Sequence, residues 1–172
     1  MNFTELAKKR CSVRSYTGEK LKKEELEQIL EAGRLAPTAK NLQPQRILVI
    51  ESDENLEKMK EITNRAEKAG AILLVCADKK NLFVNPFDNR DTAETDTSIV
   101  ATHIILKAAE LGIGSCWVCM FDREKARKAF SVPDDFSVEC IISLGYPADD
   151  FQPTENHTKY KDMNELVYFE KF

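Results

Sequence analysis

Two arginines and a serine near the N-terminus could bind an anion. Arg10, Ser12 and Arg14 place two guanidinium groups and one hydroxyl within five residues. A guanidinium group offers a fixed fork of donors that can bind two phosphate oxygens at once, and a serine hydroxyl adds a third donor. This set suits a phosphate monoester. The alternative interpretation is a solvated basic turn, because arginine and serine are common at protein surfaces.

A second candidate is the Cys-x-x-Cys spacing of Cys116 and Cys119, which thioredoxin-like and zinc sites share. In a strand, residues an odd number of positions apart point to opposite faces, and no second cysteine pair or nearby histidine completes a metal site. The chain has five cysteines, an odd number, and is long enough to fold without disulfides. We therefore predict reduced thiols packed in the core and no metal site.

The composition is typical of a folded globular protein. The chain has 172 residues, of which 42% are hydrophobic and 31% charged, with six glycines and six prolines. A chain of this length buries roughly 70% of the surface that it exposes when unfolded, which is enough for one core. We predict a single domain over residues 1–172 and exclude the disordered and fibrous classes.

Neither a membrane nor a nucleic acid is predicted as a partner. The longest apolar stretches, such as Ala71 to Ala77, are far shorter than the roughly 20 residues that a membrane span needs. The N-terminal residues lack the apolar segment of a signal peptide, so we expect a cytoplasmic location. The net charge is −4, and no long basic run with interleaved aromatic residues occurs.

Hydrophobic periodicity and end signals predict the elements that must position these residues. Helices are expected over residues 2–10, 22–35, 91–111 and 123–130, and from Ser52 towards Gly70. Strands are expected over residues 46–51, 71–77, 115–121 and 138–144. No glycine-rich phosphate loop joins a strand to a helix, so a Rossmann or P-loop fold is not predicted.

The order of four segments resembles the FMN-dependent nitroreductase family. The segments span nearly the whole chain and read RCSVRSYTGEKL, APTAKNLQPQRILVI, LKAAELGIGSCWVCMF and LGYPA. The middle segments are the more specific, since the family's loop usually reads A-P-S-A-x-N-x-Q-P. This chain departs from that pattern only at Thr38, which replaces the serine.

The resemblance implies an α+β fold, in which a mixed, mainly antiparallel sheet lies between helical layers in a three-layer α-β-α sandwich. It also implies an intertwined homodimer with each flavin between two subunits. Residues 162–172 would form a C-terminal arm that packs on the partner subunit. This arrangement explains the apolar residues at the end of the chain, which would otherwise face water.

The family's motifs also assign the residues that would bind the phosphate end of FMN. Arg10, Ser12 and Arg14 would hold the phosphate and ribityl chain, or neighbouring flavin atoms. Lys159 and Lys161 occupy the place where relatives usually carry a Lys-x-Arg or Arg-x-Arg pair on the phosphate. A lysine supplies the charge there but lacks the bidentate fork of arginine, and an exposed basic turn is the alternative.

Two further segments would border the flavin ring. The loop of the other subunit would lie against the ring through Pro37, Thr38, Ala39 and Asn41. The segment beside the reactive edge of the flavin would contain Trp117, Val118 and Cys119. Cys119 stands where a glycine often occurs, and its side chain could narrow access to the flavin or change its redox potential.

The activity implied is the transfer of reducing equivalents from NADH or NADPH to nitroaromatic, quinone or similar small acceptors by a ping-pong mechanism. Flavin N5 would carry the hydride, so no side chain is predicted to be catalytic. His103 is expected to be a core or interface residue, and Asp96 to support its helix or to orient the partner's loop. The acidic pairs at residues 134–135 and 149–150 are expected in solvated loops.

Three alternatives remain open. Specialised flavin chemistry, such as reductive dehalogenation or flavin fragmentation, would need a lid, for which Lys79 to Asp91 is the one candidate segment. The chain could also be a flavin carrier without turnover, or a dimeric interaction module without a flavin.

Overall fold

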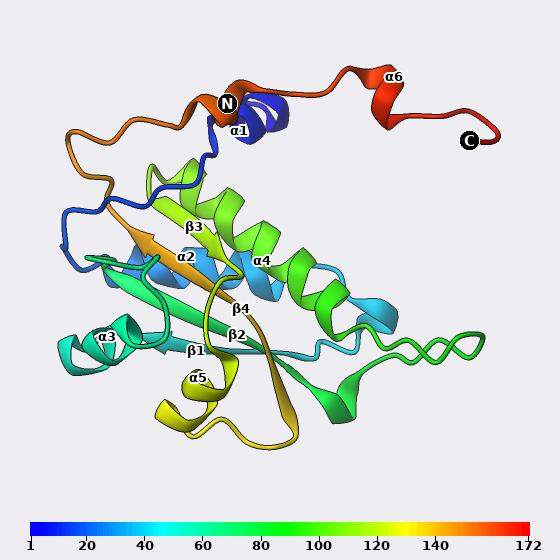
Figure 1. Cartoon of the computed structure of the whole chain (residues 1–172), viewed down its shortest axis with the longest axis horizontal. Helices are drawn as coiled ribbons and strands as arrows, with labels where there is room; N and C mark the ends of the chain where they lie inside the picture. Colours follow the sequence, from blue (N-terminus) through cyan, green and yellow to red (C-terminus); the bar gives the residue numbers. More distant parts are fainter.

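A four-stranded sheet lies at the centre of the fold (Figure 1). The computed structural model describes residues 1–172. The strands are β1 (Gln45–Ile50), β2 (Ala71–Asp78), β3 (Gly114–Val118) and β4 (Phe136–Gly145), in the order β1-β2-β4-β3. All three strand pairs are antiparallel, and an isolated parallel bridge joins Ser12 to Ser115 beside β3. The expected α+β fold is confirmed, but the sheet is entirely antiparallel rather than mixed, because the parallel pairing is confined to the isolated bridge outside the strands.

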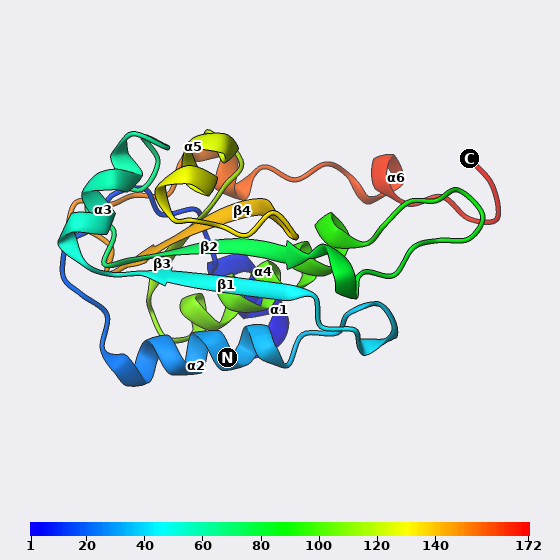
Figure 2. The same ribbon diagram turned by 90° about the horizontal axis from the view of Figure 1, so that it is seen from below.

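Helices cover both faces of the sheet and complete the three-layer sandwich (Figure 2). They are α1 (Phe3–Lys9), α2 (Lys23–Arg34), α3 (Asp53–Lys60), α4 (Ala93–Glu110), α5 (Arg123–Ala129) and α6 (Met163–Leu166). α2 and α4 pack on one face of the sheet, and α3 and α5 on the other. None of the helices combines the length and the apolar character that crossing a membrane requires.

Strand β2 explains why the sheet has a core on each side. All of its residues are buried, and residues 71–76 alternate between the two apolar clusters. Leu73 packs with α2 and α4, whereas Leu74 packs with residues of α3 and α5. Successive side chains of a strand point to opposite faces, so a continuous apolar run of this kind is typical of a strand covered on both sides.

The predicted helix ends are confirmed by their capping contacts. The Ser52 side chain accepts a hydrogen bond from the backbone N–H of Asn55 at the start of α3, at 3.4 Å. The Asp122 side chain accepts one from the N–H of Lys125 at the start of α5, at 2.9 Å. Gly112 follows α4 with φ +79°, a conformation that favours glycine.

Two predicted elements are shorter in the structure. α3 ends at Lys60 rather than running towards Gly70, and β3 ends at Val118 rather than at residue 121. The two segments that follow are tied to each other. The hydroxyl of Thr63 donates to the carbonyl oxygen of Met120 at 3.0 Å, and the backbone N–H of Asp122 donates to the carbonyl oxygen of Ile62 at 3.1 Å. These contacts join the two segments just after α3 and β3 end.

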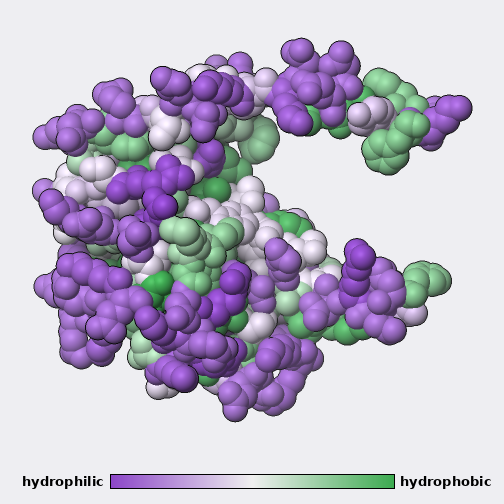
Figure 3. Space-filling view, in the orientation of Figure 1, coloured by the Kyte–Doolittle hydropathy of each residue, from purple (hydrophilic) through white to green (hydrophobic).

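The C-terminal segment, residues 152–172, runs past α1 and then away from the body of the molecule (Figure 1). It ends in an exposed apolar surface formed by Met163, Leu166, Val167, Tyr168, Phe169 and Phe172. Residues 79–91 project on the same side, with Phe87 exposed. The surface is deeply hollowed between these two projections (Figure 3).

Candidate functional site

Arg10, Ser12 and Arg14 lie on one side of an extended segment that follows α1. The backbone of Arg10 is extended, and the N–H of Val13 donates to the carbonyl oxygen of Ser115 at 2.9 Å. Alternate residues of an extended chain share a face, so Val13 turns into the core while the three polar side chains do not. Gly114 permits this close approach, since a Cβ there would lie 2.9 Å from Val13 side-chain atoms.

A polar cavity of about 390 Å³ opens beside this segment. The extended segment and α1 form one wall, and the C-terminal segment forms the other. The residues that line it are Ala7, Arg10, Cys11, Ser12, Arg14, Thr154, Asn156, His157, Lys159 and Tyr160. Four of the five side chains predicted at the phosphate therefore meet at one cavity, although Lys159 is about 150 positions from Arg10 in the chain.

The charge of this cavity suits an anion. Neither Arg10 nor Arg14 forms an ion pair with a carboxylate of the chain, whereas the other cation, Lys159, has Glu155 at 3.6 Å. Arginine forks that are not already paired can bind phosphate oxygens in bidentate fashion. Lys161, the fifth predicted residue, is exposed and is not among the residues that line the cavity.

A second, less polar cavity of about 470 Å³ lies along the end of β3. Its lining consists of Arg14, Arg65, Cys116, Trp117, Val118, Cys119 and Met120. Arg14 lines both cavities, so the two are neighbours with a guanidinium group at their junction. Together, the two cavities can accept a ligand with an anionic group at one end and a flatter, less polar group along β3.

The sequence motifs do not indicate Arg65 or the C-terminal residues Thr154, Asn156, His157 and Tyr160, all of which line these cavities. The periodicity predicts a helix over Arg65, but in the structure Arg65 lines the cavity with Met120, whose carbonyl oxygen accepts from the Thr63 hydroxyl. Asn156 and His157 lie in a short 3-10 helix, η3 (Glu155–Thr158). Their proximity to Lys159 in the sequence is the one signal that could have indicated them.

The predicted packing of Cys119 is wrong. Cys116 is buried, as expected, but Cys119 is exposed because β3 ends at Val118 and the chain leaves the sheet. Burial raises the pKa of the Cys116 thiol, an effect that nearby Arg14 opposes. The two cysteines thus lie in different environments at the same cavity.

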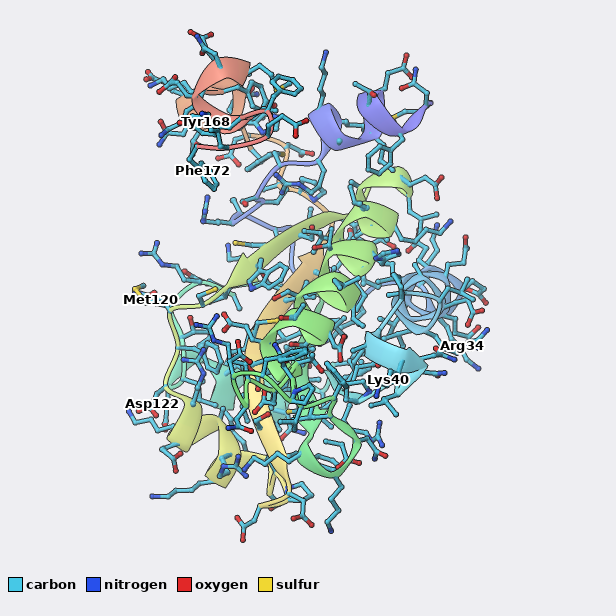
Figure 4. The ribbon with its side chains drawn as sticks, turned by 90° about the vertical axis from the view of Figure 1, so that its right-hand side faces the viewer. Arg34, Lys40, Met120, Asp122, Tyr168 and Phe172 are labelled. Atoms are coloured by element: carbon cyan, nitrogen blue, oxygen red, sulfur yellow. The ribbon has the colours of Figure 1, made fainter.

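The loop with Pro37, Thr38, Ala39 and Asn41 lies away from both cavities. Lys40 of this loop and Met120 of the second cavity lie on opposite sides of the chain (Figure 4). Asp96, which is buried at the start of α4, holds the loop: its Oδ1 accepts from the N–H of Ala39 at 2.8 Å and its Oδ2 from the Thr92 hydroxyl at 2.7 Å. Within this chain, Asp96 therefore orients its own loop.

His103 also lines neither cavity. It is half-buried on α4, and its Nδ1 lies 2.9 Å from the carbonyl oxygen of Ile99 one turn earlier. A carbonyl oxygen only accepts, so Nδ1 carries the hydrogen. This local contact agrees with a structural rather than a catalytic histidine.

Comparison with known proteins identifies the fold and the family. A model described as the nitroreductase family matches residues 7–70 and 63–146. A protein of Archaeoglobus fulgidus, named provisionally as an NADH dehydrogenase/NAD(P)H nitroreductase, is 37% identical over 148 residues, covering 82% of this chain and 83% of its own.

Two solved structures from Clostridium difficile are also similar. A nitroreductase family protein covers 100% of both chains with a TM-score of 0.94 and 40% identity. An FMN-dependent nitroreductase covers 99% of this chain and 100% of its own, with a TM-score of 0.78 and 32% identity. From the shared sheet, the matched residues and these identities, we conclude that the chain belongs to the nitroreductase family.

Proposed function

We propose that this protein is an FMN-dependent oxidoreductase that passes reducing equivalents from NADH or NADPH to nitroaromatic, quinone or similar small acceptors by a ping-pong mechanism. The observation that carries the proposal is the junction at Arg14 between the polar cavity and the second cavity along β3. FMN has the matching chemistry, with a phosphate at one end and a flat ring at the other. Relatives named as NAD(P)H nitroreductase and as FMN-dependent nitroreductase support the same conclusion.

The residues of the polar cavity would bind and orient the phosphate. Arg10 and Arg14 would supply bidentate donors, Ser12 a hydroxyl, and Lys159 a further positive charge. Lys161 remains a candidate that would have to turn towards the cavity from its exposed position.

The residues of the second cavity would border the ring. Trp117, Val118 and Cys119 would run along its edge, with the Arg65 guanidinium nearby. Bound FMN supplies the hydride chemistry, and the chain supplies binding, orientation and electrostatics. No acid or base side chain is required, which agrees with the position of His103 outside the lining of both cavities.

A homodimer would complete the site. Residues 37–41 do not line the cavity that contains Met120, and Lys40 and Met120 lie on opposite sides of the molecule, so the loop of a second copy is the candidate for the other wall. The hollow between the C-terminal segment and residues 79–91 gives such a copy room to approach (Figure 3). The arm of residues 162–172 would then bury the apolar side chains that it exposes.

Anaerobic reduction tests the activity directly. Purified protein is loaded with FMN, freed of unbound flavin, and titrated with NADH and then NADPH while the flavin absorbance is followed. We expect bleaching by at least one nicotinamide and recovery of the colour when a quinone or a nitroaromatic compound is added. Protein that binds FMN but is reduced by neither nicotinamide would be a carrier, and protein that takes up no FMN would contradict both flavin hypotheses.

A further inference from the structure

The C-terminal segment is connected to the rest of the chain by one side-chain hydrogen bond. Nε2 of His157 lies 2.9 Å from the carbonyl oxygen of Lys8, across 149 positions of the sequence. The other hydrogen bonds and the ion pair of residues 152–172 join members of that segment to each other. Apart from this bond, only packing contacts hold residues 152–172 against the rest of the chain.

The acceptor in this bond is a group that α1 leaves without a partner. Lys8 lies in the last turn of α1, where carbonyl oxygens have no intrahelical donor. A histidine N–H near the C-terminal end of a helix can satisfy such an oxygen. Since the carbonyl oxygen only accepts, Nε2 of His157 carries the hydrogen.

The same bond joins the two walls of the polar cavity. Arg10 lies two residues after Lys8, and Lys159 lies two residues after His157. Asn156 and Tyr160, which also line the cavity, belong to the segment that His157 fastens. The separation of Lys159 from Arg10 and Arg14 therefore depends on the contact between His157 and Lys8.

We propose that His157 is a positioning residue for the phosphate of the bound flavin: by donating to the Lys8 carbonyl, it holds the wall with Asn156 and Lys159 opposite Arg10 and Arg14. This inference rests on the proposed function, because it takes the anion of the polar cavity to be the FMN phosphate. The proposed role requires the N–H donor of His157 and no positive charge on its ring.

Two substitutions and two flavins test the role. His157→Phe keeps a planar ring but removes the donor, whereas His157→Gln keeps an amide N–H at about the position of Nε2. Dissociation constants are measured for FMN and for riboflavin, which lacks the phosphate, by quenching of flavin fluorescence. We expect His157→Phe to weaken FMN binding about 3- to 10-fold, the range of one neutral hydrogen bond, and to leave riboflavin binding unchanged. His157→Gln should restore FMN binding to within about 2-fold of wild type.

Trypsin cleavage of the flavin-free protein after Lys159 gives a second readout that needs no cofactor. We expect several-fold faster cleavage in His157→Phe than in wild type or His157→Gln. Equal weakening of both flavins by His157→Phe, no weakening at all, or no rescue by His157→Gln would each overturn the inference. Wild-type protein that binds neither flavin would instead overturn the proposed function, while the cleavage rates would still report whether His157 fastens the segment.

Discussion

Arg14 is the side chain on which the two halves of the site depend. It ends the run of alternating polar residues that begins at Arg10, and it lines both the polar cavity and the cavity along β3. A guanidinium group at this junction could bind the phosphate end and still border the ring of one elongated ligand.

Replacement of Arg10 by alanine should weaken FMN binding. A hydrogen bond to a charged group contributes about 1.5–3 kcal/mol, so we expect the dissociation constant to rise about 10- to 150-fold. Riboflavin binding should change little, since it has no phosphate. Arg34→Ala is a suitable control, because Arg34 is exposed on α2, pairs with Glu31 and lies far from the cavity. Unchanged FMN affinity in Arg10→Ala would show that the phosphate binds elsewhere.

Cys119 should be the most reactive thiol of the chain. It is exposed, whereas burial raises the pKa of Cys76 to about 11 and that of Cys140 to about 12, so both remain protonated near neutral pH. At pH 8, iodoacetamide should alkylate Cys119 well before the buried thiols, as peptide mass spectrometry would record.

Bound FMN should slow the alkylation of Cys119, because the thiol lines the cavity proposed for the ring. Cys11, which is half-buried in the wall of the polar cavity proposed for the phosphate, should also be alkylated more slowly when FMN is bound. Equal rates at Cys119 with and without FMN would place the ring away from residues 117–120.

At the scale of elements, the start of α4 controls the loop that follows α2. The carboxylate of Asp96 is buried and binds both the N–H of Ala39 and the hydroxyl of Thr92. The loop needs this support, since Lys40, Asn41 and Gln43 all adopt positive φ values, which are unfavourable for residues other than glycine.

Asp96→Ala should therefore destabilise the fold and loosen the loop. Removing a buried acceptor leaves the Ala39 N–H unpaired, and we expect the free energy of unfolding to fall by about 1–3 kcal/mol in urea denaturation. FMN affinity should also fall if the loop of a second copy forms one wall of the site. Asp96→Asn is the matched control, because its amide oxygen can accept from Ala39 while its NH₂ donates to the Thr92 hydroxyl. An Asp96→Ala protein with unchanged stability would contradict this role.

At the scale of the whole molecule, one chain has an open site and an exposed apolar arm. The side chains of Phe169 and Phe172 lie in water, and the hollow beside them is wide (Figure 3). Large exposed apolar surfaces of this kind mark interfaces. The functional unit that we infer is accordingly a pair of chains.

Truncation after Lys161 should impair both dimerisation and flavin retention, because it removes the apolar arm but leaves Lys161 and the lining residues of the polar cavity in place. Analytical ultracentrifugation would measure the mass, and the ratio of flavin to protein absorbance would measure retention. We expect a shift towards monomer and a lower flavin content than in the full chain. A truncated protein that remains a flavin-loaded dimer, or a stable flavin-loaded monomer, would contradict the exchange of arms.

Features that depend on near neighbours in the chain could be predicted from the sequence alone. The alternation of Arg10, Ser12 and Arg14, the caps at Ser52 and Asp122 and the order of strands and helices follow from local periodicity, capping groups and turn residues. The motifs also indicated the family, which the comparisons confirmed.

Which distant residues meet could not be predicted from the sequence and depends on the tertiary fold. It brought Lys159 to Arg10 while leaving Lys161 outside, added Arg65 to the ring cavity, and exposed Cys119 by ending β3 one residue before it. The bond between His157 and Lys8 spans 149 positions and leaves no periodic trace in either segment. Such contacts are set by how the two cores pack the sheet and its helices together, and that packing depends on all of the elements at once.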